Sequence, residues 1–152
     1  MKAVFRTLAA ISLLGIAGNV MAADKVCKIE ITGSDQMQYD KKELAVAADC
    51  TQVELTLHHS GKLPAQAMGH NWVLAKSADM GGVVSDGISA PFADDHIKKG
   101  DARVIAHTKI VGGGQSASVT FPTSALKAGE AYSFFCTFPG HSALMKGVLK
   151  FG

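Results

Sequence analysis

Gln52–His59, with the sequence QVELTLHH, alternates between polar and apolar side chains over its whole length. Its valine and leucines fall on one face, and the polar residues between them fall on the other. Successive side chains of a β-strand point to opposite faces of the sheet, so a period of two predicts a strand with one buried face. His59 continues the apolar series, whereas His58 belongs to the polar one.

Short segments of the same kind recur along most of the remaining chain. Further strands are expected at Val26–Thr32, Leu44–Cys50, Asn71–Lys76, Arg103–Lys109, Ser116–Phe121, Ala131–Cys136 and Lys146–Phe151. Glycine, proline, aspartate and serine separate these segments. About eight short strands with such turns between them indicate an all-β fold, an antiparallel sandwich or barrel.

Two glycine-containing segments interrupt the strand pattern. Ser77–Lys99 lacks alternation and has apolar residues at helical spacing, so we expect one helix there, in a flap outside the barrel near its functional end. Gly112–Gly114 lacks the Lys-Ser/Thr pair that a phosphate-binding loop requires. We expect it to be a hairpin turn.

Residues 1–22 have the pattern of a secretory signal peptide. Lys2 and Arg6 precede the uncharged, mostly apolar run Leu8–Val20, and small residues surround a cleavage position between Ala22 and Ala23. The run is too short for a membrane span, which leaves a retained anchor as the weaker alternative. We therefore expect an exported protein without membrane association, in which residues 23–152 form a single domain.

The charge balance argues against a nucleic-acid partner. The chain holds 15 Lys and Arg and 13 Asp and Glu, and the excess equals the two basic residues of the expected signal peptide. The remainder is formally neutral. It has no basic run interleaved with aromatic residues, which is the pattern that nucleic-acid-binding surfaces favour.

The cysteines form an odd set. An exported protein folds in an oxidising compartment, where one pair of thiols closes a disulfide and the third needs another explanation. Cys136 is close in sequence to histidine and methionine, so we assign it to metal binding and pair Cys27 with Cys50. Pairing of Cys136 with either of the other two is the alternative.

Cys136–Met145, with the sequence CTFPGHSALM, places a thiol, an imidazole and a thioether in one short loop between two expected strands. Soft sulfur suits Cu(I), and imidazole suits both oxidation states of copper. One Cys and two His with a weak axial Met form the blue-copper electron-transfer site. The second histidine would come from elsewhere, and His70 is the best candidate because it stands at the start of a strand, after the carbonyl of Gly69.

Three quoted segments carry a resemblance to a known family. Met68–Leu74 (MGHNWVL), Arg103–Lys109 (RVIAHTK) and Phe134–Gly147 (FFCTFPGHSALMKG) resemble the azurins, which are blue-copper proteins of the cupredoxin class. The likeness runs from about Cys27 to the C-terminus. The spacing Cys-x4-His-x3-Met is more specific than blue-copper content alone, because other cupredoxins have loops of different lengths.

This resemblance implies a cupredoxin-like Greek-key fold and one type 1 copper ion cycling between Cu(I) and Cu(II). The implied ligands are His70, Cys136 and His141, with Met145 and the Gly69 carbonyl oxygen as weak axial ligands. The backbone N–H groups of Asn71 and Phe138 would bond to the Cys136 sulfur and tune its potential. The family also has a disulfide at Cys27–Cys50 and a buried indole at Trp72.

The remaining histidines have no implied metal role. The resemblance places His59 near the site without binding copper, and a packed, hydrogen-bonded core histidine is the better interpretation. We expect His58 to be solvated and His107 to be structural. His96 lies in the flap without a partner that the sequence identifies.

An apolar patch around His141 is expected to be the docking surface for redox partners. Its expected members are Met37, Leu63, Met68, Pro139, Ala143 and Leu144, and the resemblance to the azurins adds Ile88. Exposed apolar clusters mark partner surfaces, and transient redox encounters use small interfaces. The resemblance implies a periplasmic carrier of single electrons, a monomer with transient association at most, that serves c-type cytochromes or periplasmic reductases.

Three other functions fit the sequence less well. A copper enzyme needs a second, substrate-accessible metal, and the spare histidines form no second cluster in the sequence. A zinc-binding module would gain nothing from the soft Met145. Nucleophilic catalysis by Cys136 and His141 lacks an orienting acid and an oxyanion hole. We therefore expect an electron carrier and not an enzyme.

Overall fold

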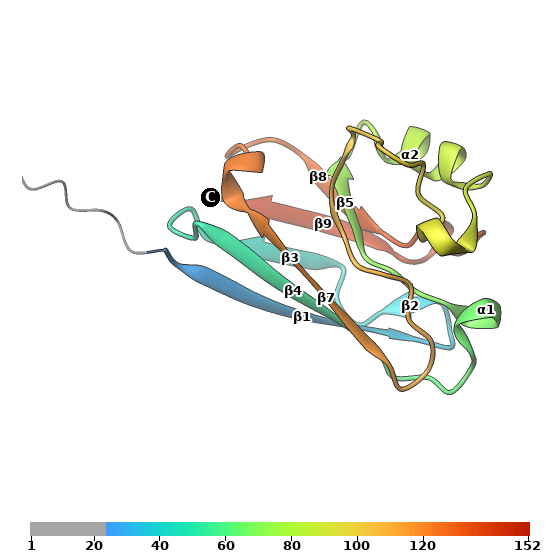
Figure 1. The fold of residues 1–152 in the computed structure, drawn as a ribbon. Helices are drawn as coiled ribbons and strands as arrows, with labels where there is room; N and C mark the ends of the chain where they lie inside the picture. Colours follow the sequence, from blue (N-terminus) through green and yellow to red (C-terminus); the bar gives the residue numbers. More distant parts are fainter. Residues whose placement is uncertain (1–23) are drawn as a thin grey trace, which may run out of the picture.

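A computed structural model describes residues 24–152 of the chain, so the expected signal peptide of residues 1–22 lies outside the described residues. Two layers of strands pack face to face (Figure 1). The first sheet has the order β2 (Gln38–Tyr39), β1 (Val26–Ser34), β4 (Gln52–His59) and β7 (Ser116–Pro122). The second has the order β3 (Glu43–Val46), β9 (Lys146–Phe151), β8 (Tyr132–Phe135), β5 (Val73–Lys76) and β6 (Val104–His107).

The predicted β-sandwich is confirmed, but its pairing is not antiparallel throughout. β1 pairs in parallel with β4, and β3 pairs in parallel with β9. Alternation of side chains has the same period in both kinds of ladder, so it could not reveal strand direction. The β2 strand was also missed, because two residues are too short to display a period.

The core lies between the sheets, as the alternation predicted. In β4 the residues alternate strictly between buried and partly exposed, and Val53, Leu55 and Leu57 are completely buried. Trp72 stacks between Phe121 and Phe134, with ring centroids 6.1 and 6.3 Å apart. Trp72 is itself fully buried, as the resemblance implied.

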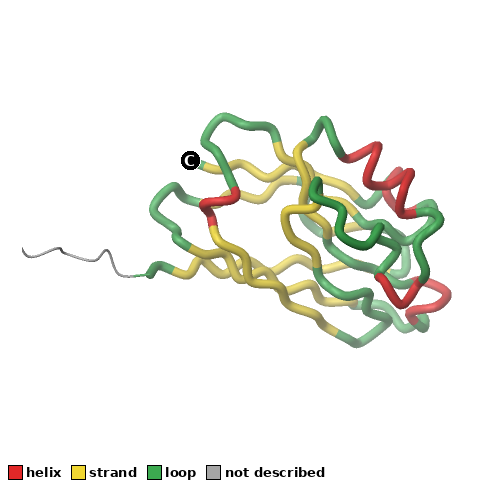
Figure 2. The backbone as a smooth tube through the Cα atoms, turned by 45° about the horizontal axis from the view of Figure 1, so that its top comes forward, coloured by secondary structure: helices red, strands yellow, loops and turns green. Residues whose placement is uncertain are grey.

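β5 is buried on both faces because the flap covers the outer face of the second sheet. Val73 and Ala75 pack against Val83 of helix α2 (Met80–Gly87) and against Ile97. The helical flap predicted within Ser77–Lys99 is thereby confirmed, and it contains an additional 3-10 helix at Phe92–Asp94. Figure 2 shows these helices outside the layers of strands.

The connection at Gly112–Gly114 does turn, but it is not a hairpin. It leads from β6 in the second sheet to β7 in the first, so its flanking strands belong to different sheets. The short helix α1 (Ala65–Met68), between β4 and β5, was not predicted, since four residues carry no helical periodicity. Among the described residues, no helix has the length and apolar character needed to cross a bilayer.

The disulfide and the loop that follows β8 lie at opposite ends of the sandwich. Cys27 is bonded to Cys50, with their Cα atoms 5.8 Å apart, and Cys136 is free and buried, so the predicted pairing is confirmed. In Figure 1 the start of β1 lies near the C-terminus, at the end opposite α1. β9 starts at the α1 end and runs toward the C-terminus, so the loop between β8 and β9 sits with α1.

Candidate metal centre

Three side chains from three segments converge at the α1 end. His70 precedes β5, Cys136 follows β8, and His141 begins the 3-10 helix His141–Ala143. Their ligand atoms all lie within 4.8 Å of one another, and all three residues are buried. Within residues 24–152 this is the one such group of histidine, cysteine or acidic side chains.

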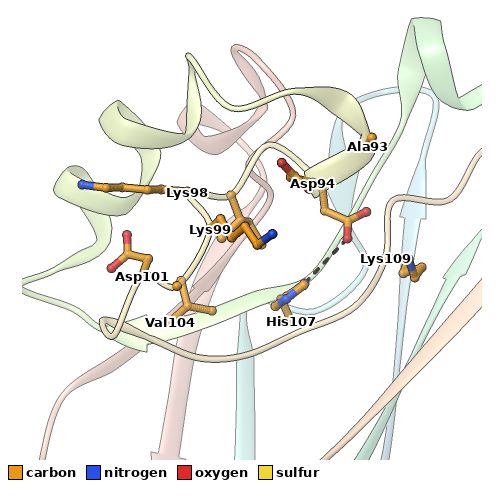
Figure 3. A pocket seen from close by; sticks show the side chains of 11 residues that line it. Ala93, Asp94, Lys98, Lys99, Asp101, Val104, His107 and Lys109 are labelled. Atoms are coloured by element: carbon orange, nitrogen blue, oxygen red, sulfur yellow. Dashed lines mark ion pairs between the residues drawn. The ribbon is translucent and has the colours of Figure 1, made fainter.

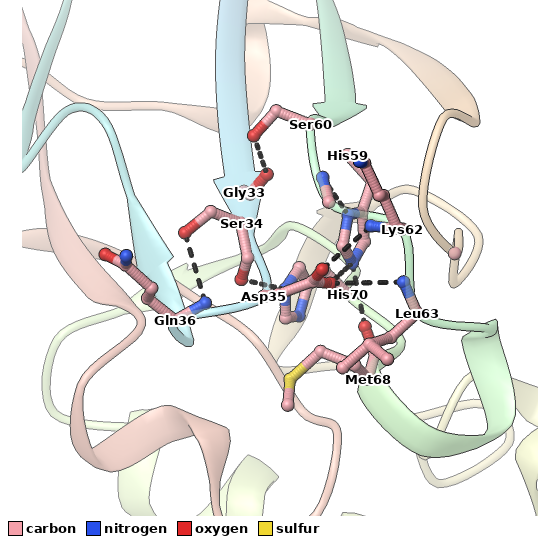
Figure 4. Close-up of polar contacts among 12 residues, drawn as sticks. Gly33, Ser34, Asp35, Gln36, His59, Ser60, Lys62, Leu63, Met68 and His70 are labelled. Carbon is pink, nitrogen blue, oxygen red and sulfur yellow. Dashed lines mark hydrogen bonds and ion pairs between the residues drawn. The ribbon is translucent and has the colours of Figure 1, made fainter.

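The His70 ring is oriented by the backbone at the end of β1. Its Nε2 lies 2.8 Å from the Ser34 carbonyl oxygen, which only accepts, so Nε2 carries the proton. The unprotonated Nδ1 then faces the His141 Nδ1 at 3.2 Å (Figure 4 shows the surroundings of His70). Burial lowers the pKa of His70, and its hydrogen bonds to the Ser34 and Gly69 backbones oppose that shift only in part.

The His141 ring, like that of His70, is neutral at pH 7. Burial, and then the nearby His70, lower the pKa of His141 to about 4, so the ring is neutral at pH 7. Its Nδ1 lies 3.8 Å from the Cys136 sulfur, and its ring packs against Phe138 with centroids 4.6 Å apart. The 3.2 Å between the two Nδ1 atoms is a span that two nitrogens bonded to one ion at about 2.0 Å each can cover.

The Cys136 sulfur is shielded from water and receives two backbone hydrogen bonds. Burial raises the pKa of Cys136 to about 12, and the N–H groups of Asn71 and Phe138 act in the opposite direction. The resemblance to the azurins implied the same two residues around the sulfur. A thiol with this pKa keeps its proton at pH 7 until a metal displaces it.

The donor set suits copper. One thiolate sulfur and two imidazole nitrogens in a buried pocket combine the soft ligand that Cu(I) prefers with ligands that both oxidation states accept. A catalytic metal site keeps an open position for water or substrate. Here Cys136 is completely buried and the His141 side chain is only 4% exposed.

Met145 and Gly69, which the resemblance implied as weak axial ligands, are both buried. Met145 is fully buried, and its backbone carbonyl accepts a hydrogen bond from the Cys136 N–H at 3.0 Å. A Cβ atom on Gly33 would lie 2.8 Å from the His70 ring and 3.3 Å from the Met145 terminal methyl group. Gly33 therefore leaves the space in which these two side chains meet. Sequence reasoning missed Gly33, because the close approach involves three distant segments.

His59 stacks on His70 and does not join the cluster, so its interpretation as a packed core histidine is confirmed. The two rings are nearly parallel, with centroids 4.3 Å apart. His59 Nδ1 accepts the Gly61 N–H at 3.0 Å, and Nε2 donates to the Met68 carbonyl at 2.8 Å, which fixes one neutral tautomer (Figure 4). The Asp35 carboxylate accepts the Lys62 N–H at 2.8 Å and so holds the turn after β4.

The other histidines lie apart from the three donors. His58 bonds to Ser116 across the outer face of the first sheet. His107 lies at a pocket of about 440 Å³ between the flap and β6, where its Nδ1 is 4.0 Å from Asp95 (Figure 3). The His96 ring meets Phe138 edge-on, with centroids 5.6 Å apart.

The residues of the predicted patch are exposed to different degrees. Ile88, Leu144 and Leu63 have exposed fractions of 67%, 52% and 42%. Pro139 and Ala143 are also exposed, whereas Met37 and Met68 are only partly so. Phe92 was missed, since nothing in its local sequence shows that the flap brings it to a shared pocket with Leu63.

Comparison with known proteins gives one consistent result. The profile of the copper-binding proteins of the plastocyanin/azurin family matches residues 25–152. Azurin-1 of Alcaligenes xylosoxydans xylosoxydans is 58% identical over 124 residues, which are 82% of this chain and 96% of that protein. Azurin of Pseudomonas aeruginosa is 52% identical over 144 residues, covering 95% of this chain and 97% of the relative.

A solved structure agrees in fold. An azurin (Az-iso2) from the methylotroph Methylomonas sp. strain J superposes with a TM-score of 0.80 at 44% identity, covering 83% of this chain and 98% of that one. The fold, the buried Cys/His/His cluster and these relatives lead to one assignment. The chain belongs to the plastocyanin/azurin family of copper-binding proteins, and its function is blue-copper electron transfer.

Proposed function

We propose that His70, Cys136 and His141 are the principal copper ligands, and that Met145 and the Gly69 carbonyl oxygen are weak additional ones. The observation that carries this assignment is the convergence of one sulfur and two imidazole nitrogens, all buried, within 4.8 Å. Copper, when bound, supplies the one-electron Cu(I)/Cu(II) couple. The chain supplies a site that needs little rearrangement to receive the metal.

The ligand side chains are held by contacts that do not depend on the metal. The Ser34 carbonyl fixes the His70 ring, and the stacked His59 supports it from one side. The Cys136 N–H and the Met145 carbonyl close the loop that carries both residues. A site held in this way changes little between oxidation states, which favours fast electron transfer.

The electron would enter and leave through the edge of His141. This residue lies in a loop whose neighbours Pro139, Ala143 and Leu144 are exposed. An exposed apolar surface beside the metal permits a small, rapidly dissociating interface with a redox partner. We propose c-type cytochromes or periplasmic reductases as these partners, with a monomeric carrier that associates transiently at most.

The proposed compartment is the periplasm. Residues 1–22 would act as a signal peptide that is cleaved between Ala22 and Ala23, and residues 23–152 would form a single cupredoxin domain. The disulfide between Cys27 and Cys50 supports an oxidising compartment, because such bonds are rare in the cytosol.

Kinetics with a reduced c-type cytochrome test the docking surface. The variant Leu144→Glu places a charge in the patch, and Val26→Glu places the same charge on an apolar residue of similar exposure at the disulfide end. We expect Leu144→Glu to slow the second-order oxidation of the cytochrome about tenfold, while Val26→Glu leaves it within about twofold. Equal effects of the two variants would contradict docking through the patch.

A further inference from the structure

Asn71 is completely buried beside the metal cluster, and contacts from several segments satisfy its polar groups. Its N–H bonds to the Cys136 sulfur. Its side-chain Nδ2 donates to the Asp95 carbonyl at 3.0 Å and to the Thr137 hydroxyl at 2.7 Å, and its Oδ1 accepts the Thr137 N–H at 2.9 Å. Any change in these contacts would therefore move an N–H group that touches the sulfur.

Tyr39 holds Asn71 from the first sheet. Its hydroxyl donates to the Asn71 backbone carbonyl, and its ring packs edge-on against Phe134 with centroids 5.6 Å apart. Burial raises the pKa of Tyr39 well above its usual value, so the phenol keeps its proton and can donate. Because Tyr39 lies on β2 while Asn71 leads into β5, this hydrogen bond joins the two sheets at the metal end.

Asp95 holds Asn71 from the flap. Its carbonyl accepts hydrogen bonds from Asn71 and from the Thr137 hydroxyl, the latter at 2.9 Å. Its backbone is left-handed, with φ of +55°, and its carboxylate accepts the Ile110 N–H at 2.8 Å. The carboxylate therefore anchors a turn that a non-glycine residue adopts at some cost.

We propose that Tyr39 and Asp95 are positioning residues of the copper centre, which hold Asn71 between them so that its N–H stays directed at the Cys136 sulfur. The proposal rests on the role of Cys136 as a copper ligand. The flap then has two roles, because it covers the outer face of β5 and also supplies Asp95 to hold Asn71. It also assigns a role to a buried phenol that neither binds metal nor reaches the surface.

The expected consequence follows from electrostatics. An N–H group directed at a thiolate stabilises negative charge on the sulfur, and the reduced site carries one more negative charge than the oxidised site. Loosening Asn71 weakens that stabilisation. We therefore expect the reduced form to lose more than the oxidised form, so that the reduction potential falls.

The first experiment uses the metal-free protein and compares Tyr39→Phe with Tyr132→Phe. Both variants remove one hydroxyl from a buried tyrosine. Tyr132 is the first residue of β8, and its hydroxyl accepts a hydrogen bond from the Lys127 N–H, away from the cluster. We expect hydrogen exchange at the Thr137 N–H to quicken at least tenfold in Tyr39→Phe only. Equal exchange in the two variants would overturn the proposal.

The second experiment measures reduction potentials of the same two copper-loaded variants. We expect Tyr39→Phe to shift the Cu(I)/Cu(II) equilibrium about threefold toward Cu(II), which is about 30 mV for a one-electron couple. Tyr132→Phe should not shift it. An unchanged potential in Tyr39→Phe would overturn the proposal even if the exchange rate had changed.

Asp95 is tested by a pair of substitutions that differ in what they preserve. Asparagine tolerates the left-handed backbone and retains an acceptor for the Ile110 N–H, whereas alanine does neither. Asp95→Ala should therefore lower the potential and quicken exchange at Thr137, and Asp95→Asn should restore both. The exposed neighbour substitution Asp94→Ala is the control. Identical behaviour of the two Asp95 variants would contradict a positioning role.

These tests separate this proposal from the ligand assignment. If Cys136 does not bind copper, Cys136→Ser will keep the optical spectrum, while the exchange measurement in metal-free protein still reports whether Tyr39 and Asp95 hold Asn71. If the ligand assignment is right and the positioning role is wrong, Cys136→Ser loses the spectrum. In that case Tyr39→Phe behaves like Tyr132→Phe in both measurements.

Discussion

The two ends of the sandwich both depend on cysteine sulfur, but they are closed in different ways. At one end Cys27 and Cys50 are bonded to each other, and this covalent link needs no metal. At the other end Cys136 meets two imidazoles and no second thiol, and hydrogen bonds hold the surrounding loops. The chemistry of a cysteine in this fold is therefore decided by which side chains the strands bring to it.

The two ends therefore have different roles: the disulfide end stabilises the fold, and the metal end carries the function. A disulfide stabilises by restricting the unfolded chain, so its effect does not depend on what happens at the far end. The metal end keeps a buried thiol and two neutral imidazoles together in the absence of metal. Since distant sites contribute independently, changes at one end should leave the properties of the other almost unaltered.

The largest effect on stability is expected from removing the disulfide. The double variant Cys27→Ser, Cys50→Ser should lower the free energy of unfolding of the metal-free protein by about 3 kcal/mol, since it frees a loop with a sequence separation of 23 residues. Denaturant unfolding, followed by fluorescence of the single tryptophan, measures it. A change in the blue absorption of the copper-loaded variant would show that the two ends are not independent.

The metal end should make the metal-free protein sensitive to acid. The unfolded state takes up a proton at His141 near pH 6.5, whereas the folded state resists protonation until about pH 4. The unfolded state thus binds more protons in this window, so stability falls as the pH is lowered from 6.5 to 4, by about 2 kcal/mol. Unfolding midpoints at several pH values measure the slope.

The matched control for this pH dependence is His141→Gln, which removes the titrating ring. This variant should have a shallower dependence in the same window. At the disulfide end, the bonded cysteines do not ionise, and a side-chain hydrogen bond from Lys25 holds the pKa of Asp49 below its usual value. A flat profile in the unmodified protein would show that burial of His141 contributes nothing to its stability.

The smallest effect is expected from Met145→Leu. This exchange conserves volume in a fully buried position and should cost less than about 1.5 kcal/mol. A weak ligand is dispensable for the colour, so the copper-loaded variant should stay blue. Its reduction potential should rise by about 30 to 60 mV, a threefold to tenfold shift toward Cu(I), because an apolar side chain disfavours the higher charge of Cu(II). Complete loss of colour would mean that Met145 is a principal ligand.

The sequence predicted those strands that alternation over several residues and flanking turn residues mark. The bounds of β4 and β9 were predicted to the residue, since alternation and turn residues mark them. Strand direction was not predictable, because β1 and β4 would alternate in the same way in either orientation. The two-residue β2 and the four-residue α1 are too short to show a period.

The same distinction applies to the candidate site, where the donors of one continuous loop were predictable and the contacts between distant segments were not. The Cys136–Met145 loop is continuous in sequence, so its donors stood out by their spacing. The space left by Gly33 and the contacts of Tyr39 and Asp95 with Asn71 join segments that are far apart in the chain. No local pattern encodes such contacts, which appear only once the two sheets and the flap are placed together.

The central claim is that the free cysteine binds copper while the bonded pair only stabilises the fold. Optical and electron paramagnetic resonance spectra of the Cu(II)-loaded protein test it most directly, recorded beside Cys136→Ser and the Cys27→Ser, Cys50→Ser double variant. We expect an intense blue band in the unmodified protein and in the double variant, and none in Cys136→Ser. A blue band that survives in Cys136→Ser would contradict the account.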